Sequence, residues 1–185
     1  MHRSRVPVVV GSIAAIAVVA AVAGGIAVAR RSPTTGRDVS FATPSGWHEF
    51  PQASFRAQEG APVTVRTVGL DTNNIVVIQS YLLTTKVDPA NLEPIRTQVD
   101  SLMHRLTSES GGSILSGPVP ATLGGLPGFR YQVSSFDPSG NPVESRVVFA
   151  FLDQTEYFMN CQHTLAHAAE IEAGCDQISQ SFRAA

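Results

Sequence analysis

Two cysteines, Cys161 and Cys175, lie fourteen positions apart near the C-terminus, in the stretch EYFMNCQHTLAHAAEIEAGCDQISQSF (156–182). This separation is unlike the C-x-x-C spacing of thiol redox motifs. Cys161 ends a predicted strand and Cys175 lies on the apolar side of a predicted helix, so a chain that turns back over a sheet can bring them to bridging distance. We expect a disulfide that pins the C-terminus, with two free thiols as the alternative.

Two histidines and a glutamate of the same stretch, His163, His167 and Glu170, have the i, i+4 and i+7 spacing of one helical face. Imidazole and carboxylate groups are common metal ligands. The stretch is not the H-E-x-x-H motif of metalloproteases, because Thr164 follows the first histidine and no glutamate between the histidines can act as a general base. His163 also follows a strand so closely that it can precede the helix. We therefore expect solvated histidines, with neither a metal site nor a cofactor.

The other short motifs of the chain do not pair a nucleophile with a base. PSGW (44–47) and LSGP (115–118) lack the G-x-S-x-G spacing of serine hydrolases. GGLPG (124–128) has neither G-x-G-x-x-G nor G-K-[ST], so it predicts a turn and not a phosphate-binding loop. We expect a protein that is not an enzyme.

Two amphipathic helices must position the C-terminal residues and cover the strands. Apolar residues recur at three- and four-residue spacing from about Pro89 to Ser108, with Asp88 as a plausible N-cap. Pro94 can be tolerated only near the first turn of this helix. The last helix shows the same period in Ile171, Cys175, Ile178 and Phe182.

Most other segments are rich in β-branched and aromatic residues and are separated by turn sequences. The first predicted strand begins at Val39, and the others are VTVRTVGL, IVVIQSYLLT, VPATL, GFRYQVSSFD, ESRVVFAFLD and TEYFMNCQ. Short loops between strands indicate antiparallel neighbours. We predict one α+β domain over residues 38–185, an α-β-α sandwich in which two helices cover an antiparallel sheet of six to seven strands.

An apolar run without charge, Val6–Ala29, precedes this domain. As a helix its 24 residues would span about 36 Å, enough for a hydrocarbon core of about 30 Å. A buried core helix would show a polar stripe, which this run lacks. A cleaved secretory signal is the stronger alternative, because AVAGG (21–25) offers small residues to a signal peptidase. We expect an uncleaved anchor: a cytoplasmic N-terminus over residues 1–5, a transmembrane helix over 6–29 and a linker over 30–37.

Charge limits the partners of the domain. The first 31 residues hold four of the 13 basic residues and none of the 15 acids, which leaves nine basic against 15 acidic side chains. An excess of acid argues against nucleic-acid binding, which needs a basic face. It also argues against adhesion to anionic lipid headgroups.

The expected disulfide predicts the compartment. Arginines flank both ends of the apolar run, so the positive-inside rule is nearly balanced. A cytosolic protein would keep Cys161 and Cys175 reduced. We therefore expect a single-pass protein of the cell membrane whose C-terminal domain is extracytoplasmic.

Four short motifs resemble, in order and roughly in spacing, the landmarks of PsbP-like domains. They are FATPSGW (41–47), GGLPGFRY (124–131), YFMNCQ (157–162) and ISQSF (178–182). The chain is most similar to the actinobacterial cell-envelope group that includes the LpqN and LpqT lipoproteins, in which a similarly placed cysteine pair is common. It differs from them in having a membrane helix where they carry a lipidated cysteine. The resemblance implies an exported α-β-α sandwich with an accessory or binding role and no catalytic residues.

These observations predict a non-catalytic accessory protein that docks onto another cell-envelope or membrane protein. Docking would use a sheet edge or exposed loops, with Trp47, Asp137 and Asn141 as candidate surface residues. The alternative is a carrier or sensor of a lipid or small apolar ligand, bound between sheet and helix. A metal-dependent enzyme that uses His163 and His167 is less favoured.

Overall fold

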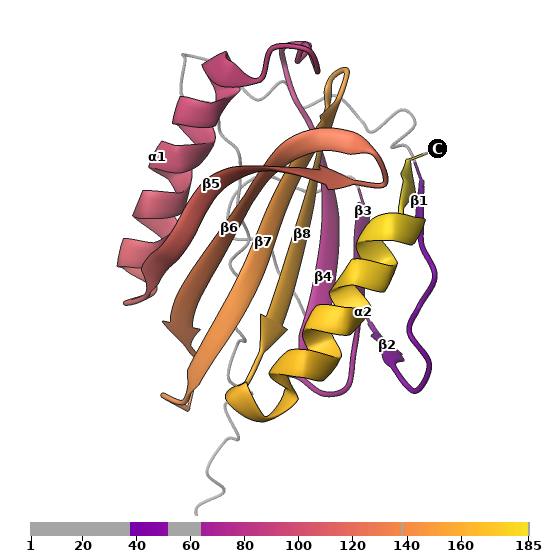
Figure 1. The fold of residues 1–185 in the computed structure, drawn as a ribbon, viewed down its shortest axis with the longest axis vertical. Coiled ribbons are helices and arrows are strands. Elements are labelled where there is room, and N and C mark those ends of the chain that lie inside the picture. The colour runs from indigo at the N-terminus through magenta and orange to yellow at the C-terminus, as the bar shows by residue number, and fades with distance from the viewer. Residues whose placement is uncertain (1–37, 52–63, 138, 185) are drawn as a thin grey trace, which may run out of the picture.

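The computed structural model describes residues 38–51, 64–137 and 139–184 (Figure 1). The predicted N-terminus over 1–5, transmembrane helix over 6–29 and linker over 30–37 lie outside the described residues. Within the part that is described, no helix is long and apolar enough to span a membrane.

Seven strands form one antiparallel sheet in the order β2-β3-β4-β8-β7-β6-β5, and β1 pairs with β9 in a separate two-stranded sheet. This confirms the predicted α+β class, the seven-stranded sheet and its two helices. The elements are β1 (Val39–Ser40), β2 (His48–Phe50), β3 (Thr64–Gly69), β4 (Ile75–Leu82), α1 (Glu93–Glu109), β5 (Ser113–Leu123), β6 (Leu126–Phe136), β7 (Pro142–Leu152), β8 (Thr155–His163), the 3₁₀ turn η2 (Leu165–His167), α2 (Ala168–Ser181) and β9 (Arg183–Ala184).

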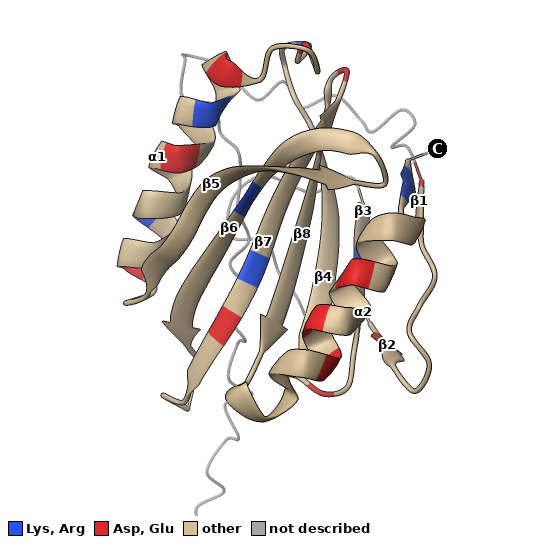
Figure 2. Cartoon of the chain, viewed as in Figure 1, with Lys and Arg blue, Asp and Glu red and all other residues tan. Residues whose placement is uncertain are grey.

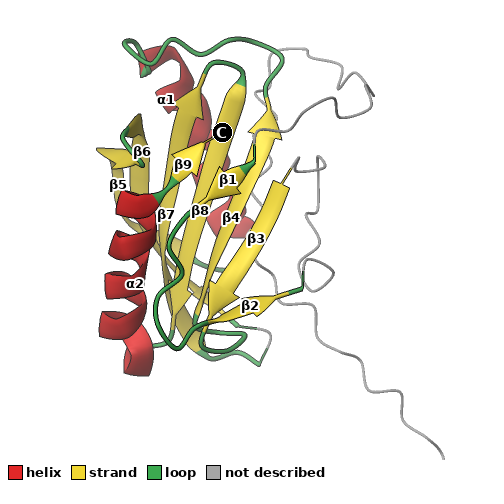
Figure 3. Ribbon diagram, turned by 90° about the vertical axis from the view of Figure 1, so that its right-hand side faces the viewer, coloured by secondary structure: helices red, strands yellow, loops and turns green. Residues whose placement is uncertain are grey.

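The two α-helices cover opposite faces of the sheet (Figure 3). On the α1 face, Tyr131 and Val133 of β6 are fully buried. Arg130, which precedes Tyr131 in the same strand, is exposed. This is the alternation expected of a strand with one covered face. The residues of α1 that meet this face are Ile95, Val99, Leu102 and Met103.

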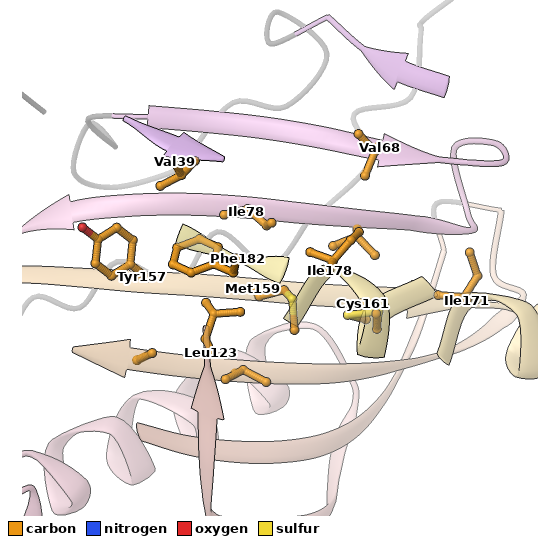
Figure 4. Close-up of a cluster of buried hydrophobic side chains, with 14 of the residues drawn as sticks. Val39, Val68, Ile78, Leu123, Tyr157, Met159, Cys161, Ile171, Ile178 and Phe182 are labelled. Carbon is orange, nitrogen blue, oxygen red and sulfur yellow. A yellow bond between two sulfur atoms is a disulfide. The ribbon is translucent and has the colours of Figure 1, made fainter. Parts of the chain in front are cut away.

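The core under α2 holds most of the C-terminal apolar residues (Figure 4). Ile171, Cys175 and Ile178 lie on one stripe of α2 and have no exposed surface. They pack against Val76 and Met159, which point to the same face of β4 and β8. The predicted period of the last helix is therefore confirmed.

The first helix begins later than its apolar period indicates. Its N-cap is Leu92, which makes no side-chain capping bond, and Pro94 lies in the first turn, where its missing N–H costs no hydrogen bond. Asp88 caps a turn before the helix instead, because its carboxylate accepts the Ala90 N–H at 2.9 Å. The predicted start at Pro89 and the N-cap role of Asp88 are wrong for this reason.

The strand predicted at Val39 exists but does not join the main sheet. Val39 pairs with Ala184 and Ser40 with Arg183, so β1 is held by residues that follow the last helix. β9 has no periodic signal because it is two residues long. This pairing ties the start of the described chain to its end.

Candidate functional site

The predicted disulfide is present. The Cys161 and Cys175 sulfurs are 2.03 Å apart, and their Cα atoms are separated by 6.3 Å. Both residues are completely buried. The bond joins the end of β8 to the middle of α2, which confirms the staple and excludes the alternative of two free thiols.

A second link between sheet and helix lies beside the disulfide. Arg146 on β7 faces Cys161 on β8, and its Nη1 lies 2.6 Å from Asp176 Oδ1. Arg146 Nη2 also donates to the Glu172 carbonyl at 3.0 Å, and Nε lies 3.1 Å from Glu172 Oε2. The Arg146 side chain is only 12% exposed. The sequence analysis does not predict this link. The pattern that could indicate it is the pair of acids Glu172 and Asp176, spaced i, i+4 on α2 next to Cys175.

The two histidines do not share a helical face. His163 is the last residue of β8 and is buried, with Nε2 3.5 Å from Glu172 Oε1. His167 ends η2, and its Nδ1 lies 3.4 Å from Glu170 Oε2. The expectation of a solvated His163 is therefore wrong, because the strand carries its ring under α2. Over the described ranges, no group of three or more His, Cys, Asp or Glu is placed to hold a metal ion.

Trp47 belongs to the core under α2 and not to an exposed loop. Its exposed fraction is 8%, and its indole lies on Gly174 of α2, where a Cβ would overlap the ring. The lack of a side chain at Gly174 therefore makes room for Trp47. The expectation that Trp47 contributes to an interaction surface is wrong for this reason.

Asp137 and Asn141 form hydrogen bonds that stabilise the β6–β7 loop, which contains both residues. Asp137 is 8% exposed, and its carboxylate accepts the backbone N–H groups of Ser139 and Asn141 at 2.9 and 2.8 Å. It also accepts the side-chain amides of Asn141 and Asn73, each at 3.0 Å. These bonds, the Asn141 side chain first, lower the pKa of Asp137. Asn141 is exposed, but its amide is engaged inside the loop.

Asn74 connects the same end of the domain to the segment before α2. It is buried, and its Oδ1 accepts the N–H and the hydroxyl of Thr164 at 2.8 and 3.0 Å. Its Nδ2 donates to Asp71. Together with the bond from Asn73 to Asp137, this joins the β3–β4 turn, the β6–β7 loop and the β8–η2 junction in one polar network, which we call the loop end.

Two large apolar side chains remain exposed at the loop end. Leu165 in η2 is 92% exposed, and Phe136 at the end of β6 is 57% exposed. β6 and β8 run in the same direction and end at the lower edge of the sheet in Figure 1, where η2 follows β8. An exposed apolar pair beside a rigid polar network is a surface suited to contact with another protein.

The sheet edges are poorly suited to binding an added strand. The edge strand β5 contains Pro118 and Pro120 and has two register shifts. Prolines cannot donate to a new strand, and irregular pairing twists an edge away from one. The opposite edge, β2, is three residues long. The side-chain surface of the loop end is therefore the better candidate for docking.

A groove of about 740 Å³ opens near the start of α1, and its lining is mostly apolar but includes Asn91, Glu93 and Thr122. Leu92 and Pro89 form one side, and Phe129, Pro120 and Pro127 form the other. Its size falls within the range of small-molecule sites. This groove is the candidate site for an apolar ligand.

No protein-family model matches the chain, and no curated protein matches it by sequence. Among solved structures, it is similar to a chain from Bacteroides thetaiotaomicron, with 9% identity, a TM-score of 0.47 and coverage of 80% of this chain but 45% of the other. It is also similar to LpqN, involved in cell envelope biogenesis of Mycobacterium tuberculosis, with 13% identity, 80% and 83% coverage and a TM-score of 0.48.

The solution structure of cyanobacterial PsbP (CyanoP) from Synechocystis sp. PCC 6803 gives a TM-score of 0.54. The identity is 13%, and the match covers 88% of this chain and 96% of CyanoP. At this identity the likeness concerns the fold. The chain therefore has the PsbP-like fold that its motifs resemble.

Proposed function

We propose that this protein is a non-catalytic accessory protein of the cell envelope. Residues 6–29 anchor it in the cell membrane, and the domain over residues 38–185 lies outside the cytoplasm and docks onto another envelope protein. The observation that carries this proposal is the buried Cys161–Cys175 disulfide. Structural disulfides persist in oxidising compartments and are rare in the cytosol.

The arrangement of polar groups supports a docking role. Glu172 and Asp176 of α2 bind His163 and Arg146 and so hold the helix on the sheet. The loop-end acids Asp71 and Asp137 hold loops together. The large apolar side chains left exposed there are Leu165 and Phe136, with Leu165 the more exposed of the two. Apolar anchors with a polar surround are typical of protein interfaces.

Alkylation of the full chain in native membranes, without reductant, tests the compartment. We expect mass spectrometry to find the peptides of Cys161 and Cys175 linked, and protease added outside intact cells to reach the domain once the wall is removed. Two alkylated thiols, or a domain protected from protease, would contradict the topology.

Photo-crosslinking in intact cells tests the docking. With benzoylphenylalanine in place of Leu165, we expect one defined adduct in repeated preparations. The same group in place of Gln98, an exposed residue of α1, is the matched control. Equal adducts from both positions, or none from Leu165 and Phe136, would rule out docking through the loop end.

A carrier of an apolar ligand is a second candidate, favoured by the groove at the start of α1. A bound lipid should then appear in native mass spectra of the purified full chain. Leu92→Asp should reduce the bound fraction, because a charge at the groove wall disfavours an apolar ligand. Spectra of both proteins without ligand would count against this function.

A further inference from the structure

We propose that the domain rests on the bilayer surface through a row of leucines at the end opposite to the loop end. The row consists of Leu82, Leu126 and Leu152, which we call the leucine rim. The inference rests on the proposed function, because it takes residues 6–29 to be a membrane anchor. It adds which surface of the domain meets lipid.

The pairing of the strands places these leucines together. Leu82 faces Thr155 in the β4–β8 pair, and Leu152 faces the same Thr155 in the β7–β8 pair. Residues opposite each other in an antiparallel pair point to the same face. Leu126 is the first residue of β6, which runs antiparallel to β7, so it stands beside the last residues of β7. The row therefore crosses four neighbouring strands at one end of the sheet.

Leu82 supplies most of the apolar surface of the rim, and the other two leucines also pack on the core. Leu82 is 71% exposed, and Leu126 and Leu152 are only partly buried against the core under α2. An exposed leucine that ends a central strand contributes little to folding. It is placed to contact a surface that the strand ends approach.

The chain reaches the domain at this same end. Val39 pairs with Ala184, which follows α2, and the C-terminal part of α2 is tied to the β5–β6 turn by the bond from Gly124 N–H to the Ser179 carbonyl at 2.7 Å. Figure 3 shows β1 and β9 near the upper ends of β4 and β7. The eight residues 30–37 span at most about 28 Å. An anchor that precedes them would hold this end, and not the loop end, near the membrane.

The turn that follows Leu152 holds an ion pair. Lys86 Nζ lies 3.0 Å from Asp153 Oδ1, so the turn next to Leu152 carries a paired cation and anion. The acids of α2 and the start of β7 lie in the lower half of Figure 2, away from this turn. The exposed Asp88 adjoins this turn, because the Val87 N–H donates to the Asp153 carbonyl at 2.8 Å. An apolar contact with an acidic surround fits a zwitterionic lipid surface and disfavours a strongly anionic one.

The test uses the full chain in nanodiscs of phosphatidylcholine that contain a diazirine-labelled phosphatidylcholine. After irradiation, mass spectrometry maps the labelled peptides. We expect label in residues 6–29 and in the peptides of Leu82 and Leu152, and little in those of Phe136 and Leu165. Leu82→Asp should lower the label at the rim by about fivefold or more, because interfacial binding scales with the apolar area buried. Leu115→Asp, at an exposed leucine of β5, should leave it unchanged.

The outcomes separate this inference from the proposed function. Label in residues 6–29 with none at the rim would overturn the inference and leave the anchor in place. No label in either region would overturn both. Rim label that is equal in Leu82→Asp and the unchanged chain, or lost equally in Leu115→Asp, would also overturn the inference. Leu82→Ser provides a second variant, and the intact disulfide in each protein verifies that it has folded.

Discussion

At the scale of single residues, Glu156 is the clearest conflict between sequence and environment. Its side chain lies in β8 between Tyr81 and Phe151, is fully buried, and has no hydrogen-bond partner for either oxygen among the described residues. Burial disfavours the charged form and raises the pKa of Glu156 to about 8 from an ordinary value of 4.5. The folded protein therefore keeps a proton that the unfolded chain has lost.

This raised pKa makes the stability fall with pH. Between about pH 5 and 8 the folded state binds one more proton than the unfolded state, so the free energy of unfolding should decrease by up to about 1.4 kcal/mol per pH unit. Glu156→Gln should remove this slope, as measured by urea unfolding at several pH values. Glu144→Gln, at an exposed position of β7, should retain it. Equal slopes in both variants would refute the assignment.

Asn74 shows how a single amide can hold two segments together. Asn74→Ala leaves the Thr164 N–H and hydroxyl without their acceptor, so we expect the free energy of unfolding to fall by about 1–3 kcal/mol. Asn91→Ala, at an exposed residue before α1, should change it by less than about 0.5 kcal/mol. Chemical denaturation of the three proteins makes the comparison, and equal stabilities of all three would contradict it.

At the scale of elements, the disulfide and Arg146 lie side by side and both attach α2 to the sheet. Replacing both cysteines by serine reopens a loop of about 15 residues and should lower the free energy of unfolding by about 3 kcal/mol. Arg146 should keep α2 in place in that variant, because its bonds to Glu172 and Asp176 do not depend on the sulfurs.

Removing the disulfide and Arg146 together tests whether their contributions to stability depend on each other. Adding Arg146→Ala to the double serine variant should destabilise it by more than Arg146→Ala destabilises the intact protein, since neighbouring contacts are not additive. Denaturation of the four proteins gives the coupling energy. A coupling near zero would show that the two links act independently.

Because Gly174 contacts Trp47, we expect a glycine-to-alanine change in this helix to destabilise the protein. Alanine favours helices over glycine by about 1 kcal/mol, yet Gly174→Ala should destabilise the protein by about 1–3 kcal/mol, because its methyl group meets the indole. The smaller ring of Trp47→Phe should recover part of the loss in the double variant. Thermal unfolding measures both, and a more stable Gly174→Ala would refute the packing.

At the scale of the whole molecule, the contact between β1 and β9 joins both ends of the described chain. Deleting residues 183–185 from the full chain should expose the backbone of Val39 and Ser40 to hydrogen exchange. The central strands β4 and β8 should keep their protection, since their pairing does not involve β9. Unchanged exchange at Val39 and Ser40 would contradict this role.

The predictable part of the fold is the part with local periodicity. The alternation in β6 and the stripe Ile171, Cys175 and Ile178 in α2 predict the sheet and the last helix, because each pattern lies within one element. The disulfide is also predictable, because it joins two elements that follow each other in the sequence. The burial of Trp47 and the pairing of β1 with β9 depend on residues more than 100 positions away. Contacts of that range leave no pattern in a short window, so the predicted interaction surface wrongly includes Trp47. Asp137 and Asn141, its other two residues, do lie in the loop end that carries the exposed Phe136 and Leu165.

The order of the strands limits when the sheet can form during synthesis of the chain. The strand β4 sits in the middle of the sheet, but its second neighbour, β8, is synthesised more than 70 residues later. A polypeptide that emerges from its N-terminus therefore cannot complete the sheet until almost all of it has been released. On the proposed export route, the chain would stay unfolded in a translocation channel for that interval, and α2 and β9 would be the last elements to pack on the sheet.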